Sequence, residues 1–474
     1  MTSQLLTELI QSMALLSVFL LIGTFIRAKV KLFQKTFIPA SVIGGFLLLL
    51  LGPIVSNILP IPQSWITTYS LIPGILIVPI VASVPLGLKL GGSKSGEGNG
   101  NGGLKSILPL FCIMGVVAFL QYVVGFGTNI VFKATGYEIY DAFGWELGMG
   151  YSGGHGTAGL LGSMYRELNL PYWELSQGIA VTTATIGLIG GIVLGMVLIN
   201  WAARKGYTSI LKKPGDIPEN MKLGYEKDIK KQGSLGRETM MSSSIDTFAF
   251  HLAIILTACG IAYLLLVLAK KFAIPGLSSI SIWAYAIVVM FAIWGIIQKL
   301  KIDYLVDSKI KGKISGTLTE YAIVAAIASL PVEAVLTHMA PILTTCVVGM
   351  AATIFPFIFL CKKFLRDNWF EHMIAAFGMS TGVFLTGLLL LRICDPEMES
   401  PVLGNYSLSY TLLTVLNFAI MPILLNIIVY KGAVAMFMVS LAFCVVYLIG
   451  AIISSKIVFR EKGVAVEEIS KRIN

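Results

Sequence analysis

The sequence has little charge and few of the residue types that build soluble active sites. Only 13% of its 474 residues are charged, whereas a soluble globular chain has about 25%. Its six cysteines form no CxxC pair and its four histidines form no ligand-spaced cluster, so neither a disulfide framework nor a zinc site is predicted. The net charge of +10 predicts no nucleic-acid partner, because basic loops beside a membrane give the same balance.

Long apolar runs make up most of the chain, and 56% of the residues are hydrophobic. A helix needs about 20 apolar residues to cross a bilayer. Runs of this length predict an all-α polytopic membrane protein in contact with membrane lipid. The predicted spans are 5–26, 39–58, 66–88, 106–132, 174–199, 246–269, 278–298, 317–336, 340–361, 405–430 and 434–455.

Two further stretches, about 143–165 and 370–393, are rich in Gly, Ser and Thr and are predicted to be re-entrant hairpins. If neither hairpin crosses the membrane, most of the basic loops fall on one side. The positive-inside rule then places the N-terminus outside and the C-terminus in the cytoplasm. Counting one hairpin as a full crossing would break this pattern.

The two hairpins also indicate an internal repeat. A shift of 228 residues aligns GYSGGHGTAGLL at 150–161 with GMSTGVFLTGLL at 378–389. We predict two inverted-topology repeats of five transmembrane helices, each with a re-entrant hairpin, because an odd number of crossings inverts the second repeat. The predicted parts are a first repeat at 1–199, a charged cytoplasmic linker at 200–245, a second repeat at 246–430, and an extra C-terminal helix with a cytoplasmic tail at 431–474.

The hairpin tips are the candidate binding site. Non-helical backbone at membrane depth survives only against protein or a water-filled cavity, and a helix N-terminus after such a turn suits a carboxylate. The alternative is a tightly packed helix pair, because small residues also pack membrane helices. For His155 a structural, hydrogen-bonding role is slightly favoured over binding substrate or carrying a proton. The candidate substrate-binding residues are Ser152, Gly153, Gly154, His155, Gly156, Thr157, Ser380, Thr381, Gly382, Thr386 and Arg392.

Polar residues in the span after each hairpin are the candidate Na⁺ ligands. Free carbonyls and hydroxyls suit a hard cation at broken membrane helices. Two pairs of polar residues occupy equivalent repeat positions, although Ser and Thr in membrane helices often bond to their own backbone. The pairs are Gln177 with Asn405 and Thr183 with Thr411.

The motif GYSGGHGTAGLLG and the segment FIPASVIGG at 37–45 resemble the bacterial sodium/glutamate symporter family. The second hairpin, the extra C-terminal span and the long 200–245 loop differ from the family pattern, as expected of a divergent member. The resemblance implies a homodimer in the bacterial inner membrane. It also implies uptake of glutamate coupled to Na⁺, the coupling ion, by an elevator movement, and it supports Ser152 through Thr157 as site residues.

The predicted function is therefore secondary active symport of Na⁺ with glutamate or a related small carboxylate, and not an enzymatic reaction. A cation/proton antiporter or a citrate-like carboxylate transporter is the alternative within transport. An integral-membrane enzyme with His155 as base is the alternative from another class, but it needs a nucleophile or metal constellation that the sequence does not display.

Overall fold

The computed structural model describes residues 3–36, 38–88, 104–209, 223–272, 282–395 and 400–461. Within these ranges every regular element is helical, and eight of the helices are long and apolar enough to cross a membrane. The prediction of an all-α polytopic membrane protein is therefore confirmed. The helices fall into two compact units, made of residues 1–93, 159–178 and 219–332 (unit 1) and of residues 94–158, 179–218 and 333–474 (unit 2).

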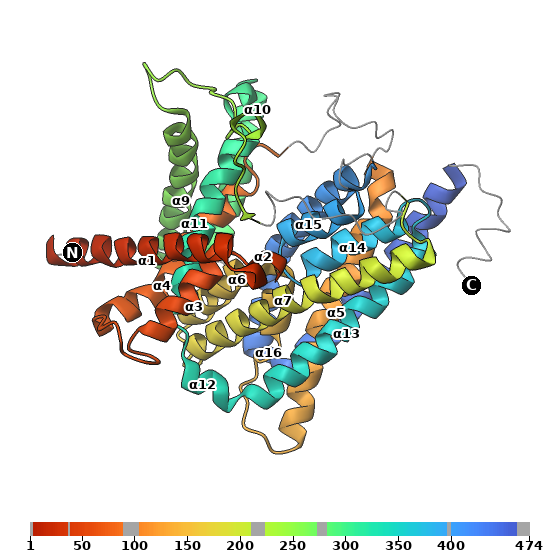
Figure 1. Cartoon of the computed structure of the whole chain (residues 1–474), viewed down its shortest axis with the longest axis horizontal. Coiled ribbons are helices and arrows are strands. Elements are labelled where there is room, and N and C mark those ends of the chain that lie inside the picture. Colours follow the sequence, from red (N-terminus) through yellow and green to blue (C-terminus); the bar gives the residue numbers. More distant parts are fainter. Residues whose placement is uncertain are drawn as a thin grey trace. The chain divides into compact units, whose positions relative to one another are not determined.

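Unit 1 is built around contacts between α1, α3, α4 and α11 (Figure 1). Its core includes Phe19, Leu48, Tyr69 and Val324, and the Tyr69 hydroxyl donates a hydrogen bond to the carbonyl of Ser12. The helices of this unit are α1 (Ser3–Lys29), α2 (Lys31–Thr36), α3 (Ala40–Leu51), α4 (Gln63–Ser83), α9 (Thr247–Lys271), α10 (Ile282–Lys299) and α11 (Ser308–Ala328), with the 3₁₀ turns η1 (Ile229–Lys231) and η2 (Asp303–Leu305).

Unit 2 is organised by α5, which packs against α16 and α13 (Figure 1). The Phe119 and Phe443 rings stack across the α5–α16 contact with their centroids 4.5 Å apart. The chain passes between the units within α6 and within α7. The helices with most of their residues in this unit are α5 (Leu104–Ala134), α7 (Trp173–Lys205), α12 (Val332–Thr337), α13 (Met339–Phe364), α14 (Trp369–Ser380), α15 (Phe384–Cys394) and α16 (Val402–Glu461), and α6 (Trp145–Glu167) is shared.

A glycine divides α16 at the boundary between the last two predicted spans. Gly432 has φ 77° and ψ −176°, a conformation that essentially only glycine adopts. The predicted spans 405–430 and 434–455 lie on either side of it. The helix therefore consists of two segments of membrane-spanning length joined by a kink.

Two predicted spans are shorter in the structure because prolines end their helices. The helix of span 39–58 ends at Leu51, and Gly52 is extended before Pro53. The helix of span 317–336 ends at Ala328, three residues before Pro331. A residue before proline is pushed away from helical geometry, so the apolar run continues past the end of each helix.

Outside the spans, Asp307 connects three parts of unit 1. Its carboxylate accepts hydrogen bonds from the amides of Lys309 and Ile310 at the start of α11 and from Arg237 Nε at 3.0 Å. Its own amide donates to His251 Nε2 at 2.8 Å. His251 Nδ1 lies 2.7 Å from the Thr247 carbonyl, so the His251 proton sits on Nδ1 and Nε2 accepts.

Replacing Asp307 with alanine is expected to lower the stability of unit 1 by about 1 kcal/mol, the usual cost of a lost N-cap. Burial alone would raise the pKa of this carboxyl, but hydrogen bonds from Arg237 and the α11 amides outweigh burial and lower the pKa. The stabilisation is therefore present above about pH 4, the ordinary pKa of an aspartate, and is lost as the pH falls through the lowered folded-state pKa. Thermal unfolding of wild type and Asp307→Ala between pH 3 and pH 6 measures how this stabilisation depends on pH. Asp307→Asn is the control, because asparagine can still cap the helix but carries no charge. A stability difference between wild type and Asp307→Ala that does not become smaller between pH 6 and pH 3 would contradict the assignment.

Candidate functional site

The chain reverses direction at Gly154 within α6. Gly154 has φ 66° and ψ −161°, a region that is essentially restricted to glycine. The Thr157 hydroxyl lies within hydrogen-bonding distance of the carbonyls of Met149 and Gly154 and shares its one proton between them. Residues 149 and 157 would lie about 12 Å apart along a straight helix, so the hydrogen bond between them requires the two halves of α6 to fold back on each other. The compact GGHG cluster is therefore a turn.

The second glycine-rich stretch consists of two helices, α14 and α15, packed side by side (Figure 1). A Cβ built on Gly378 would lie 2.8 Å from the Gly387 Cα, closer than real Cβ contacts allow. The absence of side chains at these two positions therefore permits the close packing. Residues 381–383 connect the helices, and the Val383 amide lies 3.4 Å from the Thr386 hydroxyl.

The two turns meet inside unit 2, although they are 228 residues apart in sequence. A Cβ built on Gly154 would lie 2.7 Å from Val383 Cγ1 and 3.3 Å from the Gly382 carbonyl oxygen. Gly154 therefore has to be glycine for two reasons, its backbone conformation and the lack of space. The structure brings together the two stretches that the sequence repeat paired.

Gln121, in the middle of α5, links the two turns. Its Nε2 donates to the Ser380 carbonyl at 2.7 Å and to Thr353 Oγ1 on α13 at 3.0 Å, and its Oε1 accepts from the Ser152 hydroxyl at 2.7 Å. The Ser380 carbonyl can only accept, so the amide orientation follows from the network. The sequence reasoning missed Gln121. The signal that could have found it is an amide within the otherwise apolar span 106–132.

The Ser380 hydroxyl, beside the second turn, is a buried group that could still form a hydrogen bond. Its side chain is fully buried, and the structure gives its hydroxyl no hydrogen-bond partner. An unpaired buried hydroxyl costs free energy. A solute that forms a hydrogen bond or a cation–oxygen contact with the Ser380 hydroxyl would therefore gain binding energy. Ser380 also ends α14, where helix carbonyls lack intrahelical partners. The Ser380 hydroxyl and carbonyl and the Gly382 carbonyl are therefore neutral oxygen groups at the second turn, and the Gly382 carbonyl faces Gly154.

The remaining residues of the turns are held by neighbouring helices. His155 Nε2 lies 3.0 Å from Thr185 Oγ1, and that hydroxyl donates to the Val181 carbonyl. His155 therefore donates its Nε2 proton to Thr185, which fixes the tautomer. Thr381 is fully buried and donates from its hydroxyl to the Phe377 carbonyl at 3.0 Å. Gly153 and Gly156 are half-buried, and Thr386 and Gly382 are in contact.

Thr183 lies near the first turn but is occupied in holding the hairpin. Its hydroxyl lies 2.8 Å from the Glu146 carbonyl and 2.9 Å from the Ala180 carbonyl. Its side chain is buried against Gly150. A hydroxyl with a single proton, shared between two carbonyls, is positioned to anchor the start of α6 to α7.

We expect Thr183→Val to lower the free energy of unfolding by about 1 kcal/mol, the usual value of one hydrogen bond, without changing the Na⁺ concentration that half-saturates binding. Valine keeps the shape and removes only the hydroxyl. Thermal unfolding at a series of Na⁺ concentrations measures both quantities, with Thr183→Ser as the matched control. A tenfold change in Na⁺ half-saturation would instead make Thr183 a Na⁺ ligand.

Four other predicted site residues make contacts of their own or lie at a helix end. Arg392 lies in the last turn of α15, nine residues beyond Val383, and its side chain is exposed. Gln177 lies in unit 1 against Gly162. Asn405 Nδ2 is 3.2 Å from His372 Nε2, and Thr411 donates to the Ser407 carbonyl one turn earlier. The hydrogen bonds of Asn405 and Thr411 and the contact of Gln177 are therefore with groups outside the turns, and Arg392 lies at the far end of α15.

The described residues contain no group of three or more His, Cys, Asp or Glu that could hold a metal ion. The site is thus made of backbone, amide and hydroxyl groups, which suit an alkali cation and an organic anion better than a transition metal.

Comparison with known proteins gives one family. The family model described as sodium/glutamate symporter matches residues 5–383. The match begins in α1 and ends at Val383, directly before α15, so it includes the first hairpin and the turn of the second. No curated protein matches the chain. This multi-pass membrane protein therefore belongs to the sodium/glutamate symporter family, whose name describes sodium-coupled transport.

Proposed function

We propose that the meeting point of the two hairpin turns binds Na⁺ and a small carboxylate, with glutamate as the first choice, and that the protein transports them together. The observation that carries the proposal is the contact between Gly154 and the Gly382–Val383 turn, connected through Gln121. Family membership supports glutamate and Na⁺ as the pair to test.

The chemistry of the turns divides between the two solutes. The helix segments that begin after Gly154 and after Val383 have their positive dipole ends at the turns, which favours a carboxylate. Carbonyls at the end of α14 and the unpartnered Ser380 hydroxyl favour the cation. Na⁺ is thus cargo, held by neutral oxygens, and its charge is balanced by the substrate anion.

The proposed mechanism is an elevator movement. Both turns and Gln121 belong to unit 2, so the binding residues can move as one body and stay in contact with each other while unit 1 remains in place. We further propose the inverted repeat architecture, a homodimer, and a bacterial inner-membrane location with the N-terminus outside and the C-terminus in the cytoplasm. The pattern of basic loops supports this orientation.

Purified protein in proteoliposomes provides the test. We expect labelled glutamate to accumulate only under an inward Na⁺ gradient, and unlabelled small carboxylates to compete according to their fit. Empty liposomes and liposomes with K⁺ in place of Na⁺ are the controls. Glutamate uptake that is indifferent to Na⁺ would contradict the coupling. A proton flux driven by Na⁺ without any organic substrate would favour the antiporter alternative.

A further inference from the structure

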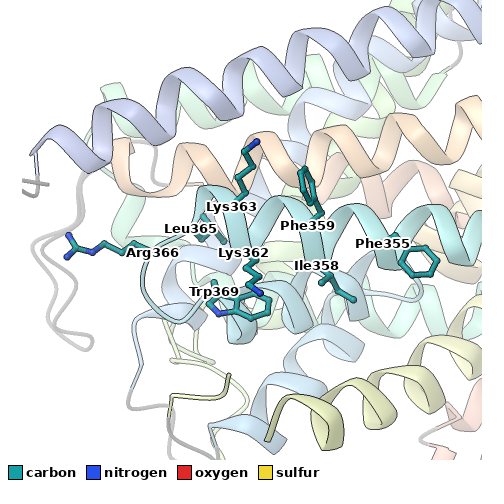
Figure 2. Close-up of a pocket in the computed structure, with 8 residues that line it drawn as sticks. All are labelled: Phe355, Ile358, Phe359, Lys362, Lys363, Leu365, Arg366 and Trp369. Atoms are coloured by element: carbon teal, nitrogen blue, oxygen red, sulfur yellow. The ribbon is translucent and has the colours of Figure 1, made fainter. Parts of the chain in front are cut away.

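A basic groove lies at the end of α13, within unit 2 and separate in sequence from the hairpin turns. The groove has a volume of about 820 Å³ (Figure 2), within the range of small-molecule sites. It follows the last turns of α13 and the loop into α14. Its lining residues are Phe355, Ile358, Phe359, Lys362, Lys363, Leu365, Arg366 and Trp369.

The cations of the groove are available for a ligand. Within the described part of the chain, Lys362, Lys363 and Arg366 form no ion pair with a carboxylate. Of the nearby acids, Asp367 has an interaction of its own. Glu371 is buried and accepts from the Ser209 amide. The net charge that faces the groove is therefore positive.

Aromatic rings lie beside two of these cations, and Lys363 Nζ is 5.4 Å from the centroid of the Phe359 ring. Lys362 Nζ lies 5.0 Å from the centroid of the Tyr207 ring, a cation–π distance. The Tyr207 ring packs edge to face with Trp369 and with Trp201. Lys362 and Trp369 both line the groove (Figure 2). Trp and Tyr beside Lys and Arg are typical of the interface between a membrane and water.

The deeper part of the groove is apolar and uncovered. Phe355 and Phe359 are 69% and 61% exposed, one turn apart on α13, a helix apolar enough to span the membrane. Seven residues separate Phe355 from Lys362, which is about 10 Å along the helix. Phe355 therefore lies farther toward the apolar middle of α13 than the three cations, and Phe359 lies between them, with Lys363 Nζ 5.4 Å from its ring centroid.

We propose that this groove binds an anionic phospholipid, with the phosphodiester at Lys362, Lys363 and Arg366 and an acyl chain along Phe355 and Phe359. A soluble anion would use the charges but would leave the exposed Phe355 ring without a partner, whereas the Phe359 ring already has Lys363 Nζ 5.4 Å from its centroid. Basic pockets of this kind at the ends of membrane helices bind anionic headgroups. The proposal depends on the membrane location of α13 and not on the transported solute.

The test uses the full chain in vesicles of phosphatidylcholine and phosphatidylglycerol, with bromine on the acyl chains of only one of the two lipids. Bromine quenches tryptophan fluorescence at short range, and the difference between wild type and Trp369→Phe isolates the emission of Trp369. We expect stronger quenching by brominated phosphatidylglycerol. The variant Lys362→Gln/Lys363→Gln/Arg366→Gln is expected to lower that preference by about tenfold or more, since each surface cation adds about 1 kcal/mol to the attraction.

The matched control is Lys299→Gln/Lys309→Gln/Lys313→Gln, which removes the same charge from three exposed lysines of unit 1. It is expected to keep the lipid preference. Equal quenching by the two brominated lipids in wild type would overturn the proposal, and so would an equal loss in the control variant. If the triple variant does not fold, Arg366→Gln alone, at an exposed position beyond the end of α13, is expected to reduce the preference by about fivefold.

Discussion

Replacing Gly154 with alanine is expected to abolish Na⁺-driven uptake, with a loss of at least about 100-fold per folded molecule. The φ 66°, ψ −161° conformation of Gly154 costs a residue with a Cβ about 1–3 kcal/mol. The added methyl would also lie 2.7 Å from Val383 Cγ1, so the turns must separate. Each 1.4 kcal/mol corresponds to a tenfold change in rate, and the two effects act together at the proposed binding point.

Gly432 supplies the matched control, because its φ 77° and ψ −176° are nearly the same as those of Gly154. A Cβ on Gly432 meets no atom within 4 Å. Gly432→Ala should therefore lower thermal stability through backbone strain and keep uptake per folded molecule near the wild-type value. Uptake by Gly154→Ala as fast as by Gly432→Ala would show that contact between the turns is not needed for transport.

Replacing Gln121 with methionine, which is similar in volume, is expected to remove the response to Na⁺ and to reduce uptake by at least about 100-fold. The substitution leaves the Ser152 hydroxyl and the Ser380 carbonyl without their present partner, at about 1–3 kcal/mol for each unsatisfied buried group. The turns lose the side chain that holds both of them to α5. Because a ligand that binds the folded state raises its apparent stability, thermal unfolding with and without Na⁺ measures the effect directly.

Asn129→Leu is the control for Gln121 because both amides are buried in α5. Asn129 Nδ2 donates to the carbonyls of Tyr140, Asp141 and Phe143, in the loop before α6. Its loss should reduce stability by a similar amount but leave the Na⁺ half-saturation of the remaining folded protein unchanged. If Gln121→Met keeps the wild-type Na⁺ response, the amide network is structural and the cation site lies elsewhere.

The turns themselves were predictable because their signal is local. A compact run of glycines in an apolar chain indicates a break, and the Gly154 backbone adopts a conformation that glycine alone tolerates. The boundary between the last two spans is equally local, since Gly432 interrupts α16 between them. Proline positions could have corrected the ends of α3 and α11, because Pro53 and Pro331 follow those helices closely.

The partners of polar side chains were not predictable in the same way. Equivalent repeat positions suggested Thr183 and Asn405 as Na⁺ ligands, but the hydroxyl of Thr183 is engaged by backbone carbonyls and Asn405 by His372. Arg392 follows the second turn by only nine residues, yet the rise of α15 carries it about 13 Å away from Val383 along the helix axis. Spacing in a sequence does not say which neighbour will satisfy a polar group.

The sequence by itself determined that this chain is an all-helical membrane protein and where its helices break, because apolar length and glycine content act within a few residues of each other. Only the tertiary structure decided that the two breaks meet and that Gln121 joins Ser152 to Ser380, 259 residues farther along the chain than Gln121. Contacts at that separation depend on how whole helices pack. A single buried amide among apolar residues becomes informative only when the groups around it are in place.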